Sequence, residues 1–226
     1  MDSEHRRLVE RLQDKNTSGD GSFRYVEGTL GGNHVMLTQC GIGKVSAAVG
    51  ASELIRRFSP DCIVSTGVAG GIDACLKVTD VVASQRLVYH DVWCGDGNEY
   101  GQVQGFPASY EGCPSLLKHA LSLNEAGMES RIHSGLVCTG DQFITNRTEL
   151  DTIKQRFPDG LAVDMESAAI AQTCYLYNVP FLSFRIISDT PGVEDHASQY
   201  ADFWGTMAER SFLTIWTFLS TLPSNL

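Results

Sequence analysis

Residues 160–189 read GLAVDMESAAIAQTCYLYNVPFLSFRIISD, and this stretch decides the fold. Its apolar start, residues 160–165, predicts a short buried strand. Residues 166–178 are small and apolar enough to predict a buried helix, and residues 180–189 predict a second apolar strand. A strand, a helix and a strand in such close succession are typical of α/β proteins.

Acidic residues stand at the edges of these core segments. Asp164 and Glu166 lie where the first strand gives way to the helix, and Asp189 ends the second strand, four residues after Arg185. One interpretation is structural: an N-capping side chain and a buried Arg185–Asp189 ion pair. The other is functional, because burial at a strand end that faces a cleft raises the pKa of a carboxyl group and suits it to general-acid catalysis.

The rest of the chain alternates in the same way. Short strands broken by glycine turns are predicted over residues 16–39. Further strands are predicted at residues 61–66, 80–91 and 132–139, and helices at residues 8–12, 44–58, 115–123, 149–157 and 199–222. No linker, repeat or low-complexity tract divides the chain. We therefore expect one α/β domain over residues 1–226, with a mixed central β-sheet flanked by helices in three layers.

Composition narrows the class of protein. The 226 residues suffice for a large core, and a net charge of −10 argues against a nucleic-acid groove. Seven cysteines without any CxxC pair indicate reduced thiols and a cytoplasmic protein rather than a disulfide or zinc framework. No run of 18 apolar residues predicts a membrane span, and the polar first residues do not predict a secretory signal. We expect no metal and no cofactor.

Two further polar clusters follow predicted strands. STGVAGG, residues 65–71, is interpreted either as a tight turn that needs positive φ or as backbone that approaches a ligand closely. TGDQFITN, residues 139–146, carries Phe143 and Ile144, which either plug the core or offer a face to a flat ring. The neighbouring His90 and Asp91 have no further triad partner, so a structural pair is favoured.

Taken together, CGIGKVSAAVG, STGVAGGI, YHDVW, TGDQFI, VDMESAAIA and RIISD resemble the nucleoside phosphorylase/nucleosidase superfamily. Within it they are most similar to the bacterial nucleosidases that cleave 5′-methylthioadenosine and S-adenosylhomocysteine to adenine and a thioribose product. The resemblance implies a homodimer with a small nucleoside substrate. A phosphorylase, or a nucleosidase for another nucleoside such as futalosine, is the alternative enzyme, and a non-catalytic nucleoside-binding protein is the alternative outside enzymes.

The resemblance also implies roles for individual residues. The catalytic ones would be Glu4, which activates water, Asp189, the general acid at N7 of adenine, Glu166, which binds the ribose hydroxyls, and Arg185, which positions Glu4, Glu166 and the water. Substrate contacts would come from Met165 on the sugar, Phe143 and Ile144 on the purine, Ser188 on Asp189, Tyr200 on the 5′-alkylthio group, and Val68.

Two departures from the superfamily pattern bear on the site. Its members begin with a short apolar strand before the segment that carries Glu4, and we expect that first strand to be missing here. Val68 replaces a serine that relatives often carry near the water or phosphate site. Because a valine side chain binds neither water nor phosphate, Val68 disfavours a phosphorylase.

Overall fold

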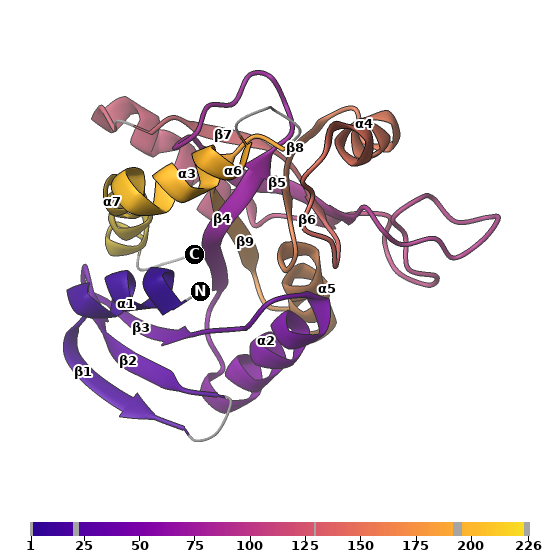
Figure 1. The fold of residues 1–226 in the computed structure, drawn as a ribbon. Coiled ribbons are helices and arrows are strands. Elements are labelled where there is room, and N and C mark those ends of the chain that lie inside the picture. Colours follow the sequence, from indigo (N-terminus) through magenta and orange to yellow (C-terminus); the bar gives the residue numbers. More distant parts are fainter. Residues whose placement is uncertain (1, 20–22, 129, 192–195, 224–226) are drawn as a thin grey trace.

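The fold is built around a twisted mixed sheet that closes on itself (Figure 1). The structure is a computed structural model and describes residues 2–19, 23–128, 130–191 and 196–223. The strands of the closed sheet are β4 (Ile63–Gly71), β9 (Phe181–Asp189), β5 (Val81–Tyr89), β7 (Ile132–Thr139) and β8 (Gly160–Asp164). Short β6 (Tyr110–Glu111) pairs with the second half of β5. The mixed α/β class predicted from the sequence is confirmed.

Pairing around the ring explains the closure. β4 runs parallel to β9, β5 to β7 and β7 to β8, whereas β9–β5 and β8–β4 are antiparallel. Three of these pairings contain a register shift, and such bulges bend strands and increase their twist. The sheet is therefore a closed ring within its helices, whereas a flat three-layer arrangement would leave two open edges.

Helices cover the outside of the ring (Figure 1). They are α1 (Asp2–Arg11), α2 (Lys44–Phe58), α3 (Pro114–Ser122), α4 (Arg147–Arg156), α5 (Ser167–Tyr177), α6 (His196–Asp202) and α7 (Ala208–Ser220). A short 3₁₀ turn, Leu123–Ala126, follows α3. The single C-terminal helix predicted over residues 199–222 is interrupted, because Phe203–Met207 form a π-helical turn between α6 and α7. Among the described residues, no helix is long and apolar enough to cross a membrane.

Burial follows the sequence pattern closely. All nine residues of β9 are buried, as expected of a strand covered on both faces. In α5 the small residues Ala168, Ala169 and Ala171 are buried, which lets this helix pack tightly on the sheet. On the other side, Phe184 of β9 stacks on Phe218 of α7 with 4.6 Å between ring centroids.

A separate three-stranded meander lies beside the ring. It consists of β1 (Gln13–Ser18), β2 (Tyr25–Leu30) and β3 (Asn33–Thr38). Among the described residues, β3 pairs only with β2, and β4 meets β8 only at Gly70 and Gly71. In the part of the chain that the structure describes, no strand stands between β3 and β4.

Candidate active site

Asp189 and Ser188 lie at the carboxyl end of β9. Ala69 of β4 pairs with Ile187 and Gly70 with Asp189, so Ser188 is an extra residue in the ladder. Such a bulge at a strand end redirects the side chains that follow it. The Ser188 hydroxyl donates to Asp189 Oδ1 at 2.5 Å, and the Asp189 residue is only 3% exposed. A buried carboxyl group is thus fixed in one orientation at the end of the strand.

The start of α5 is organised by Asp164. Its carboxylate accepts from the Ser167 backbone N–H at 3.2 Å and from the Thr139 hydroxyl at 2.6 Å. A carboxylate that accepts from the first N–H groups of a helix stabilises the helix terminus. We therefore interpret Asp164 as structural. Glu166, two residues later, stands at the start of the helix.

Arg185 joins the two acids of this segment. Its Nε lies 2.9 Å from Asp164 Oδ2, and its Nη2 lies 3.5 Å from Glu166 Oε2. Ser65 accepts a further hydrogen bond from Nη2 at 3.1 Å. The Arg185–Asp189 pair considered from the sequence does not explain Arg185, because four residues along a strand span roughly 13 Å.

Glu166 has a second tether from a distant part of the chain. Its Oε1 accepts from the Gly43 N–H at 3.1 Å, just before α2. The two carboxylate oxygens are thus held by different groups, a backbone amide and a guanidinium. Its side chain is only 14% exposed, so a ligand hydroxyl would meet a carboxylate whose direction is already set.

The aromatic side of the site comes from the loop after β7 and from α6. The Phe143 ring is 59% exposed and packs edge to face with Tyr200 of α6, with 6.0 Å between centroids. The side chain of Ile144 is buried in the core beside α4. Of the two interpretations of this loop, plugging the core describes Ile144, whereas Phe143 is open to a ligand.

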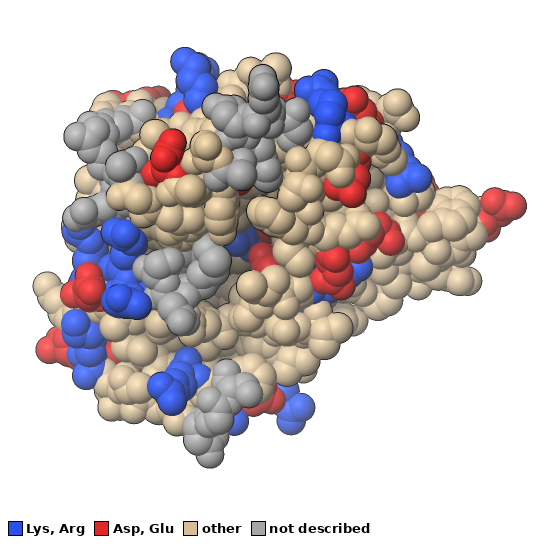
Figure 2. Space-filling model, in the orientation of Figure 1, with Lys and Arg blue, Asp and Glu red and all other residues tan. Residues whose placement is uncertain are grey.

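One cavity of about 1180 Å³ gathers these residues. It is lined by all the predicted substrate and acid residues whose side chains are described: Val68, Phe143, Ile144, Met165, Glu166, Arg185, Ser188, Asp189 and Tyr200. Figure 2 shows a hollow near the middle of this face, with acidic and basic atoms visible inside it. Apolar residues and convergent polar groups line the cavity together, as is usual for small-molecule sites.

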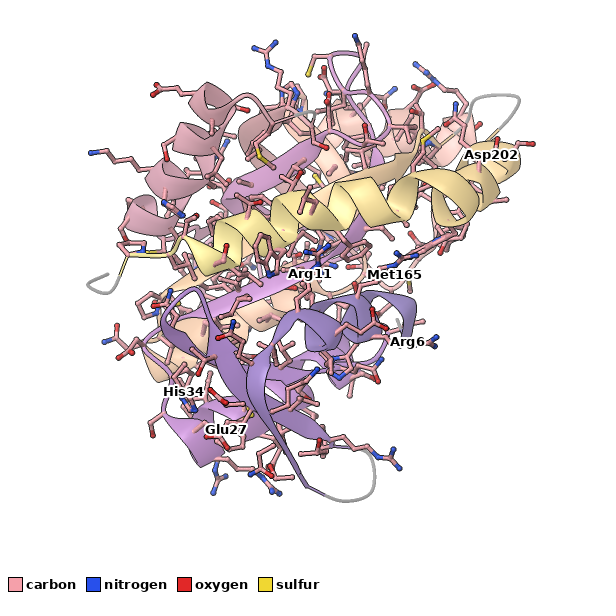
Figure 3. The ribbon with its side chains drawn as sticks, turned by 90° about the vertical axis from the view of Figure 1, so that its left-hand side faces the viewer. Arg6, Arg11, Glu27, His34, Met165 and Asp202 are labelled. Atoms are coloured by element: carbon pink, nitrogen blue, oxygen red, sulfur yellow. The ribbon has the colours of Figure 1, made fainter. Side chains whose placement is uncertain are left out.

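The cavity extends beyond the site residues named above. It continues between the edges of β3 and β4 and reaches His34, whose Nε2 lies 2.7 Å from Glu27 Oε1. Figure 3 labels Met165 at one end, between α1 and the C-terminal helices, and His34 and Glu27 at the other. Glu4 lies on α1, but its side chain is outside the part of the chain that the structure describes. The next residue, His5, lines the cavity.

Two sequence interpretations need correction. STGVAGG is not a tight turn, because residues 65–71 continue β4. A Cβ on Gly70 would meet Pro191 at 2.8 Å, so this glycine permits close packing. The structural pair of His90 and Asp91 favoured from the sequence is not what holds Asp91 either, since the Asp91 carboxylate accepts from Lys44 Nζ at 2.8 Å. Burial lowers the pKa of His90.

Sequence reasoning missed several groups near the acids. Gly43 contributes only its backbone, and Ser65 acts from the middle of a strand, so neither had a side-chain signal at a loop. Cys40 also lines the cavity, and burial raises the pKa of its thiol. The second glycine of GIGK suits the positive φ of Gly43, which is 87°. The pattern does not indicate which carboxylate accepts from the Gly43 N–H.

The fold and the site together define a class of protein. It is an α/β protein with a closed mixed β-sheet and a small-molecule cavity lined by acidic residues, an arginine and an aromatic ring. Residues 1–220 match the family described as the phosphorylase superfamily, and the chain belongs to that superfamily.

Individual relatives are similar over most of their length. The 5′-methylthioadenosine/S-adenosylhomocysteine nucleosidase of Chromohalobacter salexigens is 42% identical over 199 residues, 88% of this chain and 85% of the relative. The nucleosidase structure from Neisseria meningitidis, in complex with methylthio-immucillin-A, has a TM-score of 0.92 at 34% identity and covers 98% of this chain and 96% of its own. That of Colwellia psychrerythraea, in complex with adenine, has a TM-score of 0.90 at 35% identity and covers 97% and 91%.

Proposed function

We propose that the protein hydrolyses the N-glycosidic bond of 5′-methylthioadenosine and S-adenosylhomocysteine and releases adenine and the corresponding thioribose. The observation that carries this proposal is the shared cavity of Asp189, Glu166, Arg185 and Phe143. Relatives with 36–42% identity that are named as 5′-methylthioadenosine/S-adenosylhomocysteine nucleosidases support it.

Asp189 acts on the leaving group. Adenine leaves poorly as an anion, so a proton from the Asp189 carboxyl group to N7 lets the C1′–N9 electron pair depart onto a neutral base. The hydrogen bond from Ser188 fixes the carboxyl group for this transfer. Phe143 stacks on the purine, the Ile144 backbone contacts its Watson–Crick edge, and Val68 lines the pocket.

The sugar is held at the other acid. Glu166 accepts hydrogen bonds from the ribose 2′- and 3′-hydroxyls, Met165 packs on the ring, and Tyr200 covers the 5′-alkylthio group. The negative charge of Glu166 also stabilises the positive charge that develops at C1′. Glu4 takes the proton of the water that attacks C1′, with Arg185 positioning both; the neighbouring residue of α1, His5, lines the cavity and supports this placement.

Product analysis tests the proposal. We expect adenine and a free thioribose from 5′-methylthioadenosine and S-adenosylhomocysteine in phosphate-free buffer, and little product from inosine. An obligatory phosphorylase would need phosphate and would yield the sugar 1-phosphate. A protein that binds these nucleosides and releases no base would refute an enzymatic function.

A homodimer and a cytoplasmic location are further parts of the proposal. α2 and α5 pack together and present apolar side chains to solvent: Val45, Val49, Tyr175, Leu176 and Tyr177, with Ile42 just before α2 and Trp93 on the loop after β5. An apolar surface of this kind marks an interface. Seven free cysteines suit a reducing compartment. Residues 1–226 would act as one domain.

Light scattering tests the dimer. Wild type should have twice the 24.7 kDa mass of one chain at micromolar concentration. Val45 is 77% exposed, and Val45→Asp should give monomers. Leu213 of α7 is 44% exposed and serves as the control, because Leu213→Asp should leave the dimer intact. A fully active wild-type monomer would contradict the proposal.

A further inference from the structure

A partly buried charge cluster joins three segments next to the site. The Lys44 ammonium donates to both Asp91 oxygens, at 2.9 and 2.8 Å, and lies 5.4 Å from the centroid of the Tyr89 ring. The Asp91 carboxylate also accepts from the Asp141 N–H at 2.9 Å. Side-chain exposures of 23% for Lys44 and 18% for Asp91 make this more than a surface ion pair.

The same residues close the start of α2. The Lys44 N–H donates to Asp141 Oδ1 at 2.7 Å, and the preceding Gly43 N–H donates to Glu166 Oε1 at 3.1 Å. The helix has no side-chain cap of its own at Gly43. Two carboxylates from distant loops therefore satisfy N–H groups that the helix leaves open, at the end where the helix dipole favours negative charge.

The geometry at Gly43 leaves little freedom. Its φ of 87° is in the left-handed region, and a Cβ there would lie 2.9 Å from Asp141 Oδ1. The direction of the Gly43 N–H thus depends on where Lys44 and Asp141 sit. Burial opposes ionisation of Asp91, yet the hydrogen bonds from Lys44 and the Asp141 N–H hold the pKa of Asp91 below its usual value. Lys44 therefore faces a carboxylate at neutral pH.

We propose that Lys44 is a positioning residue: by binding Asp91 through its ammonium and Asp141 through its backbone, it aims the Gly43 N–H at Glu166 and fixes this carboxylate for the sugar. The inference rests on the proposed function, in which Glu166 binds the ribose. Lys44 itself is not among the residues that line the cavity. Its effect on the reaction passes through Gly43 and Glu166.

Steady-state kinetics with 5′-methylthioadenosine and a matched control test this role. Lys154 makes a similar set of bonds away from the site: its Nζ donates to Asp73 Oδ2 at 2.9 Å, to the Pro158 carbonyl at 2.8 Å and to the Gly160 carbonyl at 3.0 Å. Its side chain is 26% exposed, close to the 23% of Lys44. Lys154→Met therefore imitates the loss of stability without touching Glu166.

We expect Lys44→Met to lower kcat/KM by about 10- to 100-fold, since small misplacements of binding groups have effects of this size. Lys154→Met should stay within about twofold of wild type per folded molecule, and Lys44→Arg, which keeps a cation for Asp91, should fall between them. Equal losses in Lys44→Met and Lys154→Met would overturn the inference. If Lys44→Met does not fold, Asp91→Asn weakens the same contact from the other side and should also lower kcat/KM.

A double-mutant cycle isolates the route. In a Glu166→Gln background, Lys44→Met should cost less than about twofold in kcat/KM, because its effect passes through a carboxylate that is already lost. A full additive loss in that background would mean that Lys44 acts elsewhere.

Hydrogen exchange separates this inference from the proposed function. The Gly43 and Lys44 amides should exchange at least about tenfold faster in Lys44→Met than in wild type, and at the wild-type rate in Lys154→Met. Unchanged exchange in Lys44→Met would refute the positioning role even if wild type releases adenine. If wild type releases no adenine, the proposed function fails, and exchange alone still decides whether Lys44 fixes this turn.

Discussion

Replacing Asp189 by asparagine should abolish most turnover while leaving the fold intact. The introduced side-chain amide could still accept the Ser188 hydroxyl and donate a hydrogen bond to N7, so substrate should still bind. The amide N–H is far too weak an acid to deliver a proton to N7. General-acid catalysis is typically worth ~10²–10⁴ in rate, which corresponds to about 3 to 5 kcal/mol in the activation free energy. We expect kcat to fall by this factor with a small change in KM.

The expected stability change is small for a structural reason. The ion pairs of Arg185 are with Asp164 and Glu166, so Asp189→Asn does not strand a buried guanidinium. The loss should be close to that of one hydrogen bond, about 1 kcal/mol, which lowers the melting temperature of a chain of this size by roughly 2–4 °C.

Asp80→Asn is the matched control. Asp80 is also buried, and its Oδ2 accepts from the Lys77 N–H at 3.0 Å and lies 3.1 Å from His133 Nε2. It does not line the cavity. Asp80→Asn should melt earlier and keep normal turnover per folded molecule, the reverse of Asp189→Asn. Turnover and melting temperature measured on the same samples decide the matter: normal turnover in folded Asp189→Asn would refute the general-acid role.

Three other changes have definite expected outcomes. Glu166→Gln should lower kcat by ~10² or more, since an amide stabilises no positive charge at C1′; adenine release measures this, and near-normal activity in a folded variant would contradict the sugar-binding role. Phe143→Ala should raise KM about tenfold, because stacking on a base is worth about 1–3 kcal/mol; as the ring is exposed, calorimetry should show an unchanged melting temperature. In the native protein, alkylation at pH 8 followed by mass spectrometry should find exposed Cys94 modified much faster than Cys62 and Cys174, because burial raises the pKa of Cys62 to about 11 and of Cys174 to about 12; rapid modification of Cys174 at pH 8 would count against its burial.

The chain's local pattern predicted most of its elements and the placing of its acidic residues at their edges. Strand-helix-strand alternation over residues 160–189 appears as β8, α5 and β9, because apolar runs and small-residue helices depend on neighbours in sequence. Asp189 and Glu166 were singled out for the same reason, since Asp189 ends β9 and Glu166 directly precedes α5.

Only the tertiary structure decided which groups bind the acidic side chains of the site. The contact between Gly43 and Glu166 spans 123 residues, and Arg185 bonds to Asp164 rather than to an acid on its own strand. Such pairings depend on strand order and on the bulge at Ser188, which bring the ends of β4, β8 and β9 together. Local propensity determines where a strand stops, but the closure of the sheet determines what its last side chain meets, because hydrogen-bond partners across a ring lie far apart in sequence.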